Sequence, residues 1–270
     1  MMLASPNNDA TMIDSTAALD TAAQRLRELH EIGRPLLLVN VWDAASAHAV
    51  LAAGSPAIAT SSIAMARSRG GSDDNSDHEA AFAQVRQIAA AADVPVTADL
   101  EGGYGLSPDE LVDAMLHAGA VGCNIEDTDH STGDALLDAG AQAEYLAGIR
   151  AAATRRGVGI VLNARIDAII RHPGRDAAAA LDEVLRRAKL YFDAGVDCVY
   201  PVSLREPALV AEVVRRLRRP VNVNPSDPLS ALADAGAARI SLGGGVHNWM
   251  MRELQQRAAR LVAGDAAAFA

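Results

Sequence analysis

Eight short apolar runs, each followed by a helical pattern, dominate the chain from Leu36 onward. The runs cover residues 36–41, 57–60, 94–99, 121–125, 160–165, 198–200, 221–223 and 239–242. They are continuously apolar, which is typical of parallel strands covered on both faces. Eight such units in 270 residues predict an α/β fold, a (β/α)8 TIM barrel. A doubly wound open sheet is the alternative, but no Gly-x-Gly-x-x-Gly follows the first run.

The chain ends suggest a simple domain organisation. Residues 1–14 are small and polar, so we expect a disordered N-terminal tail without a signal peptide, followed by a single barrel domain over residues 15–264. An amphipathic helix is expected over residues 15–31, before the first strand, and the last helix over residues 246–262.

Charge and cysteine usage limit the partners and the compartment. The net charge is −10 and no basic cluster occurs, which argues against nucleic acid or an anionic membrane as a partner. No apolar run approaches the ~20 residues of a membrane span. Cys123 and Cys198 lie in strand-like runs, so we expect unpaired structural thiols and a cytoplasmic location.

Two carboxylates, Asp99 and Glu101, stand where the third strand should end. The period of a β-strand would point both to the same side. Glycines follow at 102, 103 and 105, so the backbone can turn sharply before a helix that opens at Ser107-Pro108. Paired acids cost free energy unless a proton or a cation lies between them. The stretch indicates either a Mg²⁺ or acid–base site, or a solvated acidic loop.

Polar and charged residues recur at the predicted carboxyl ends of the other strands, where barrel enzymes have their active sites. They are Trp42-Asp43, Ser61-Ser62, Glu126-Asp127, Arg165 with Asp167, Pro201 with Ser203, Asn222 with Asn224, and the glycines at 243–245. At least three carboxylates and one arginine would therefore meet at one mouth. This convergence favours a metal-dependent site.

Seven motifs on successive strands resemble the isocitrate lyase/phosphoenolpyruvate mutase (phosphonomutase) superfamily. They are NVWD at 40–43, ATSS at 59–62, ADLEGGYG at 98–105, NIED at 124–127, NARID at 163–167, GVDCVYP at 195–201 and RISLG at 239–243. The resemblance implies a Mg²⁺- or Mn²⁺-dependent enzyme that makes or breaks a C–C or P–C bond through a pyruvate-type enolate. It also implies a homo-oligomer, a dimer or tetramer, whose C-terminal helix packs on a neighbouring subunit.

The resemblance also implies roles for single residues. Asp99 would be the nearest metal ligand, Glu101 and Glu126 would hold the metal through water, and Asp73 or the adjacent Asp74 would complete the set. The substrate would be a small anionic molecule held by the backbone of Ser61, Ser62 and Ile63, and by Trp42, Arg165 and Asn224. Three alternatives stay open: Trp42 as plain core, Arg165 paired internally with Asp167 or Glu126, and the serines as helix caps.

The loop after the fourth strand departs from the superfamily pattern. Residues 128–134 hold neither the lysine and cysteine of the isocitrate lyases nor the lysine and asparagine of the phosphonomutases. A C–C lyase or a decarboxylase that needs little from this loop fits best, with Asp99, Glu126, Arg165, Tyr104 and His130 as catalytic candidates. Of these, His130 would have a pKa near neutrality and could be a general acid, or it could be a solvated histidine. A P–C bond enzyme and a non-catalytic binder of small acids are the alternatives.

Overall fold

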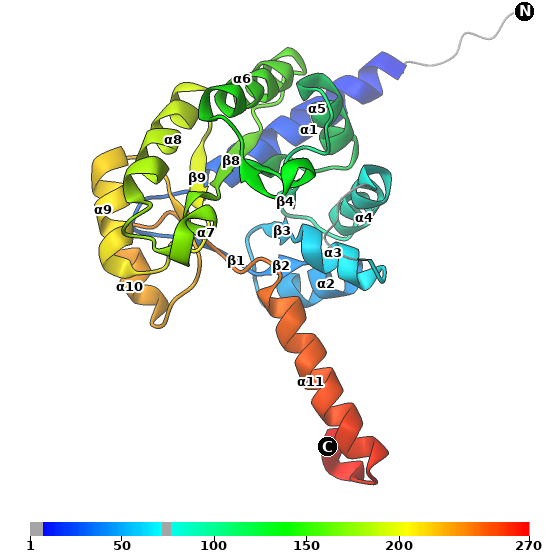
Figure 1. Ribbon diagram of the computed structural model, residues 1–270. Helices are drawn as coiled ribbons and strands as arrows, with labels where there is room; N and C mark the ends of the chain where they lie inside the picture. The colour runs from blue at the N-terminus through cyan, green and yellow to red at the C-terminus, as the bar shows by residue number, and fades with distance from the viewer. Residues whose placement is uncertain (1–7, 72–76, 270) are drawn as a thin grey trace, which may run out of the picture.

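The computed structural model describes residues 8–71 and 77–269 (Figure 1). The strands are β1 (Leu36–Leu38), β2 (Asn40–Val41), β3 (Ile58–Thr60), β4 (Val96–Asp99), β5 (Gly122–Glu126), β6 (Thr128–Asp129), β7 (Ala135–Leu136), β8 (Val161–Ile166), β9 (Cys198–Pro201), β10 (Asn222–Val223) and β11 (Arg239–Ser241). The α-helices are α1 (Asn8–Glu28), α2 (Ala44–Ala52), α3 (Ser62–Ser68), α4 (His78–Ala90), α5 (Pro108–His117), α6 (Ala139–Arg155), α7 (Ala168–Arg171), α8 (Leu181–Asp193), α9 (Pro207–Leu217), α10 (Leu229–Asp234) and α11 (Gly245–Val262). Short 3₁₀ turns are η1 (His130–Thr132), η2 (Pro173–Arg175) and η3 (Ala266–Phe269).

The parallel pairings of the strands follow the order of a barrel. One sheet runs β2-β3-β4-β5-β8-β9, and a second runs β1-β11-β10. Only Val39 separates β1 from β2, and a parallel bridge between Val199 and Val221 links the ends of the two sheets. The pairings thus lead round the lumen and back to the first strand, with helices outside (Figure 1). The predicted (β/α)8 barrel is confirmed.

Several boundaries differ from the sequence prediction. Helix α1 begins at Asn8 and ends at Glu28, whereas the sequence predicted a tail to residue 14 and a helix over residues 15–31. Residues 1–7 lie outside the described part. Helix α3, helix α7 and the β6–β7 hairpin were not predicted, because each is a short element held by tertiary contacts rather than by a hydrophobic period.

Helix α1 covers the amino-terminal end of the barrel. Ala23 and Leu26 are fully buried, and Leu26 lies so close to Gly122 that a Cβ there would come within 2.7 Å of it. Arg27 bonds Asp197 at 2.9 Å and the carbonyl of Gly159 at 2.8 Å. These contacts join α1 to the starts of β5, β8 and β9, so the opposite end of the barrel is left as the open mouth.

Local signals explain several of the helices around the barrel. Ser107 and Glu110 form a capping box, with Pro108 in the first helical turn of α5 as predicted. Asp43 caps α2 by accepting a hydrogen bond from the Ser46 amide at 2.7 Å. These caps fix the residue at which each helix begins. They therefore also fix the length of the segment between the strand end and the helix, which contributes to the mouth.

Helix α11 extends away from the barrel (Figure 1). Its exposed apolar side chains include Trp249 at 57% and Leu254 at 52% exposure, and Val262 at 89%. Within the described residues, no helix has both the length and the apolar character needed to cross a membrane.

Candidate active site at the carboxyl ends of the strands

Two levels of inward-facing side chains build the mouth. Asp99 on β4 is the register partner of Asn124 on β5, which in turn pairs with Asn163 on β8. Glu126 and Arg165 are partners two residues further along β5 and β8. Because register partners in a parallel sheet point to the same side, the first level forms a floor and the second a rim above it.

Asp99 is held by the segment that follows β3. Its Oδ2 accepts hydrogen bonds from the Ser62 amide at 3.2 Å and from the Ser62 hydroxyl at 2.9 Å. Its own amide donates to Thr60 Oγ1 at 3.0 Å. The carboxylate is thereby fixed in orientation, while its Oδ1 accepts no hydrogen bond from the part of the chain that the structure describes. Asp99 is suited to contribute one oxygen to a cation.

Glu101 reaches the mouth by a different geometry from the one predicted. Strand β4 ends at Asp99, and Glu101 lies in the following turn with φ +52°. The period of a strand therefore does not place these two acids together, and that part of the prediction is wrong. Tyr104 has φ +58° in the same turn. Non-glycine residues with positive φ store strain and are concentrated at functional sites.

Tyr104 belongs to the same turn and carries a buried phenol. Burial raises its pKa well above 10, and the negative charges of Glu101, Asp99 and, more weakly, Glu126 raise it further. The Glu126 amide donates to the Glu101 carbonyl at 2.8 Å, which places the turn of Glu101 and Tyr104 against the end of β5. The phenol oxygen of Tyr104 is buried and has no hydrogen-bond partner among the described residues. Tyr104 thus remains a neutral phenol at the edge of an acidic site.

Glu126 lies between two cations. Its Oε2 is 2.5 Å from Arg165 Nη1, and its Oε1 is 2.5 Å from His130 Nε2. Burial raises the pKa of Glu126, against the opposing effects of His130 and Arg165. The hydrogen bond to Glu126 is the main cause that raises the pKa of His130 to about 9, with Asp134 adding to it. The expected near-neutral pKa of His130 is therefore wrong for this structure.

Arg165 forms internal ion pairs with both Asp167 and Glu126, which confirms the alternative that it pairs within the protein. Its Nε donates to Asp167 Oδ1 at 2.7 Å and its Nη2 to Asp167 Oδ2 at 3.0 Å. Burial would lower the pKa of Arg165, but the charges of Asp167 and Glu126 outweigh it and the pKa is raised. The two acids hold the guanidinium plane at the rim, so its position is set before any ligand arrives.

The loop over residues 128–136 is tied to the same network. Thr128 Oγ1 donates to Asp167 Oδ2 at 2.6 Å. Asp134 accepts from Arg171 at 3.0 Å and lies 2.7 Å from the second nitrogen of His130. With the antiparallel β6–β7 pairing, these contacts close the loop against the rim.

The segment 61–63 is a helix start packed against the last strand. Ser61 is fully buried and caps α3, its hydroxyl accepting from the Ala64 amide at 3.4 Å. The alternative role of helix cap is therefore realised for Ser61, whereas Ser62 binds Asp99. A Cβ on Gly244 would lie 2.7 Å from Cγ2 of Ile63. Only glycine lets the two segments approach this closely.

Asn224 connects two neighbouring strand ends. Its Oδ1 accepts from the Ser203 amide at 2.6 Å, and its Nδ2 donates to the Tyr200 hydroxyl at 2.9 Å. Tyr200 is the register partner of Arg165, so Asn224 lies beside the rim. Both ends of the Asn224 amide are already used, which makes it a support for the rim in this structure.

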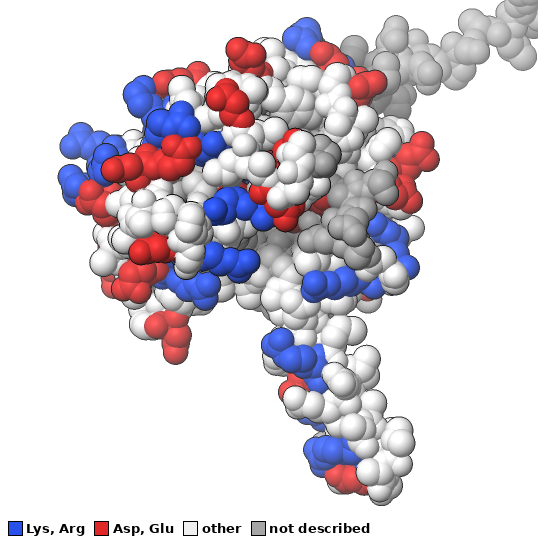
Figure 2. Space-filling model, in the orientation of Figure 1, with Lys and Arg blue, Asp and Glu red and all other residues white. Residues whose placement is uncertain are grey.

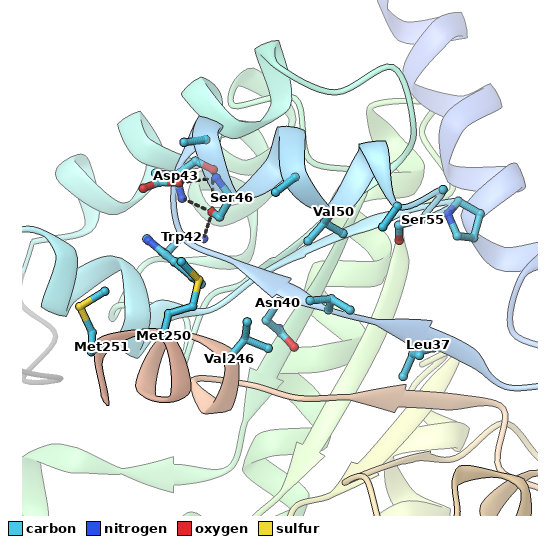
Figure 3. A pocket seen from close by; sticks show the side chains of 16 residues that line it. Leu37, Asn40, Trp42, Asp43, Ser46, Val50, Ser55, Val246, Met250 and Met251 are labelled. Carbon is cyan, nitrogen blue, oxygen red and sulfur yellow. Dashed lines mark hydrogen bonds between the residues drawn. The ribbon is translucent and has the colours of Figure 1, made fainter. Parts of the chain in front are cut away.

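Trp42 lies beside a second, apolar groove (Figure 3). Its ring meets that of His247 edge-on at 4.9 Å, and it is nearly buried. The groove, here called the α2–α11 groove, has a volume of about 790 Å³. It is lined by Leu37, Val39, Asn40, Trp42, Asp43, Ala45, Ser46, Ala49, Val50, Ala53, Gly54, Ser55, Pro56, Val246, Met250 and Met251. In the close-up, the Met250 and Met251 side chains project from α11 at the end of the groove where Trp42 lies (Figure 3).

The acids fit a hard cation that keeps its water shell. Among residues 8–71 and 77–269, no three His, Cys, Asp or Glu side chains converge closely enough to hold a metal ion by themselves. Mg²⁺ usually takes only one or two protein carboxylates and retains several waters. Asp99 as the direct ligand, with Glu101 and Glu126 acting through water, agrees with this donor set. Asp73 and Asp74 lie outside the described residues.

Charge on the outer surface is mixed. Figure 2 shows acidic and basic side chains interspersed over the barrel, while much of α11 is white. Cys123 and Cys198 are unpaired and buried, as predicted, and burial raises the pKa of each thiol to about 12. Neither thiol is suited to act as the acid of the reaction.

The chain belongs to the phosphoenolpyruvate phosphomutase family, whose sequence model matches residues 26–262. It thereby falls in the isocitrate lyase/phosphoenolpyruvate mutase superfamily, whose members are lyases and mutases that generally use a divalent metal. An uncharacterised protein of Mycobacterium tuberculosis H37Rv is 32% identical over 218 residues, 80% of each chain.

Solved structures place the fold in the same group. A candidate phosphonomutase from Burkholderia cenocepacia J2315 is 37% identical, with a TM-score of 0.83 over 91% of this chain and 99% of that one. An oxaloacetate acetylhydrolase in complex with oxalate has a TM-score of 0.78 at 19% identity, covering 90% and 87% of the two chains. Methylisocitrate lyase and dimethylmalate lyase are further members of the superfamily.

The structure also brings forward residues that the sequence reasoning did not select. Asp167 is fully buried at the centre of the rim network, and Asn124 and Arg239 meet inside the lumen. All three residues belong to the recognised motifs, and the sequence predicted Asp167 only as a possible internal partner of Arg165. Arg239 stands at the start of β11, where a sequence pattern gives no sign that the side chain crosses the lumen.

Proposed function

We propose that this protein is a Mg²⁺- or Mn²⁺-dependent C–C bond lyase or decarboxylase. Its substrate would be a small 2-oxo or 2-hydroxy polycarboxylate of the methylisocitrate, dimethylmalate or oxaloacetate type. The observation that carries the proposal is geometric: Asp99 and Glu126 stand at the ends of the neighbouring strands β4 and β5, the Glu126 amide donates to the Glu101 carbonyl at 2.8 Å, and Arg165 pairs with Glu126. A cation held there would stabilise the negative charge of a pyruvate-type enolate.

The remaining residues would bind and orient the acid. Arg165 faces the mouth as a permanently charged group that can hold a carboxylate with paired hydrogen bonds. We propose that the segment of Ser61, Ser62 and Ile63 binds the substrate carboxylate through its backbone, chiefly through the Ile63 amide, because the Ser61 amide donates to Val41 at 3.0 Å and the Ser62 amide donates to Asp99 at 3.2 Å. Trp42 and Asn224 would form two of the walls of the substrate pocket.

Two side chains are candidates for the proton donor. Tyr104 keeps its proton because its pKa is raised, and its hydroxyl has no partner in the described part of the chain. His130 belongs to the loop that covers the rim and touches Glu126 at 2.5 Å. We assign the donor role to one of these two, since the loop has neither cysteine nor lysine over residues 128–134.

A P–C bond enzyme is the second candidate. The candidate phosphonomutase at 37% identity favours it, and Arg165 could hold a phosphonate as well as a carboxylate. The loop composition weighs against it. A binder of small acids without turnover is the third outcome that the test must recognise.

Pyruvate release distinguishes these functions. The protein is assayed with lactate dehydrogenase coupling, with and without Mg²⁺, on methylisocitrate, dimethylmalate, oxaloacetate and phosphonopyruvate. Mg²⁺-dependent pyruvate from a carbon substrate supports the proposal. Pyruvate from phosphonopyruvate alone would replace it with the P–C enzyme. Tight oxalate binding without any turnover would leave only the binder.

We further propose that a second copy of this chain covers the α2–α11 groove with its own α11. The groove is apolar and lies at the base of a helix whose exposed side chains include Trp249 and Leu254. The expected assembly is a dimer or tetramer of the 28.1 kDa chain. Light scattering on the wild type and on Leu254→Glu tests this: the variant should dissociate, and a monomeric wild type would refute the proposal. The cytoplasm is our proposed location.

A further inference from the structure

A single arginine crosses the interior of the barrel beneath the rim. Arg239 begins β11 and is fully buried. Its Nη2 donates to Asn124 Oδ1 on β5 at 3.2 Å. Strands β11 and β5 are not neighbours in either sheet and lie on opposite sides of the ring, so this hydrogen bond spans the lumen. The other nitrogens, Nε and Nη1, have no partner among the described residues.

Arg239 decides which way the Asn124 amide is turned. Asn124 Oδ1 accepts a second hydrogen bond, from Asn163 Nδ2 at 2.7 Å. Reversing both amides would preserve the bond between the two asparagines but would set Asn124 Nδ2 against Arg239 Nη2. A guanidinium can only donate, so that arrangement would oppose two donors. The arginine therefore requires oxygen toward itself and Nδ2 away from it.

The Nδ2 group of Asn124 is directed to accessible space. No described residue accepts a hydrogen bond from it, and it is not among the fully buried polar atoms that lack a partner. Asn124 is the register partner of Asp99 and precedes Glu126 by two positions on the same face of β5. An amide donor thus stands on the floor of the mouth, between the residues proposed to hold the metal.

We propose that Asn124 Nδ2 binds an oxygen of the substrate acid, a carboxylate or enolate oxygen, and that Arg239 is the residue that positions it. This inference rests on the proposed function. Asn124 would select for an acceptor at the deepest point of the ligand, because a ligand without an oxygen there would leave the donor unpaired. Arg239 touches no substrate atom and acts through the Asn124 amide.

If Arg239 served only to stabilise the fold, its surroundings would differ from those observed. An arginine retained for stability is normally paired with an acid, since an unpaired buried charge is costly. Burial lowers the pKa of Arg239, and no carboxylate lies within ion-pair distance of it in the described residues. What the guanidinium does achieve is a fixed polarity for Asn124 and Asn163. The free-energy cost of burying an unpaired guanidinium is therefore consistent with a requirement for one fixed orientation of the amides on the floor of the mouth.

Oxalate binding to the Mn²⁺-loaded protein tests the role of Asn124. Calorimetry first measures Mn²⁺, then oxalate, on the wild type, Asn124→Leu and Asn124→Asp. The leucine variant removes the donor without adding charge, and the aspartate variant gives Arg239 a counter-ion and so guards against misfolding. Both should bind oxalate about tenfold more weakly or worse, with Mn²⁺ affinity in the leucine variant within about threefold of the wild type. Oxalate affinity within twofold of the wild type in both variants would overturn the inference.

Two arginine variants test positioning. Arg239→Lys keeps a group that only donates and should retain most of the oxalate affinity, whereas Arg239→Met lets the amide turn and should lose it. Asn222→Ala is the matched control, because it removes a buried amide that bonds Ser241 rather than Asn124. Equal oxalate affinity in the lysine and methionine variants would refute positioning. If the wild type itself binds Mn²⁺ but no oxalate, the proposed function fails, and that result differs from a failure of Asn124 alone.

Discussion

The Cβ position of Gly244, after the last strand, lies 2.7 Å from Cγ2 of Ile63 at the start of α3. This contact joins the segment that follows β11 to the start of α3, which follows β3. It also sets the place of the neighbouring Ser62, whose amide and hydroxyl bind Asp99. The close approach of glycine to isoleucine is therefore part of how the acidic site is built.

We predict that Gly244→Ala destabilises the protein by about 1–3 kcal/mol, since overpacking of a fitted contact costs this much. The displaced Ile63 should also shift Ser62 and raise KM. Gly245→Ala is the matched control, because a Cβ there meets nothing within 4 Å and alanine favours the helix that it begins. Thermal unfolding and steady-state kinetics measure both variants. Equal stability and KM in the two would contradict the packing argument.

Asp99→Asn should remove metal-dependent activity and leave the fold intact. The amide oxygen of the new asparagine can still accept hydrogen bonds from Ser62, but the negative charge that attracts the cation is lost. We expect a loss of ~100-fold or more in kcat/KM, the scale for removing a major electrostatic contribution. Mn²⁺ titration and circular dichroism give binding and fold separately. Unchanged turnover would remove Asp99 from the metal site.

Asp43→Asn is a suitable control for that variant. Asp43 also follows a strand, but its carboxylate caps α2 and lines the α2–α11 groove. Asparagine is an equally good cap, so stability should change little. Metal affinity should stay at the wild-type value. A comparable loss of metal affinity in both variants would indicate a general effect of charge rather than a site.

The order of strands and helices could be predicted because each strand is a continuous apolar run that only a covered parallel sheet can bury. The acids of the mouth could be predicted because the ends of such strands meet. The turn that carries Glu101 could not, since its positive φ is imposed by the surrounding contacts and leaves no pattern in the residue type. The partners of Arg165 and the bond from Arg239 to Asn124 depend on distances across the lumen, which sequence spacing does not contain.

The pKa of His130 should be about 9 in the metal-free protein, measured by NMR titration of the imidazole. Because the folded-state pKa is raised, the contact stabilises the protein below the unfolded value of 6.5 and loses its effect as pH rises through 9. Glu126→Gln should return the pKa toward 6.5, and Asp134→Asn should do so less, because Glu126 is the larger cause. An unchanged pKa in Glu126→Gln would refute the pairing.

His30 gives the opposite pH dependence at the closed end of the barrel. Burial, followed by the charge of Arg239, lowers its pKa from 6.5 to about 4. Its Nδ1 lies 2.8 Å from the Leu26 carbonyl, and Nε2 is buried without a partner among the described residues. The folded protein therefore keeps this histidine neutral, while the unfolded chain binds a proton as pH falls below 6.5.

The free energy of unfolding should consequently decrease as pH falls from 6.5 to about 4, by about 3 kcal/mol from this residue, at about 1.4 kcal/mol for each pH unit. His30→Gln should have a shallower dependence over this range, even if its stability at pH 7 is lower. His48→Gln, which removes an exposed imidazole on α2, should keep the wild-type slope. Urea unfolding at a series of pH values compares the three proteins. If His30→Gln and the wild type show the same slope, His30 does not titrate on unfolding and its burial has no role in acid sensitivity.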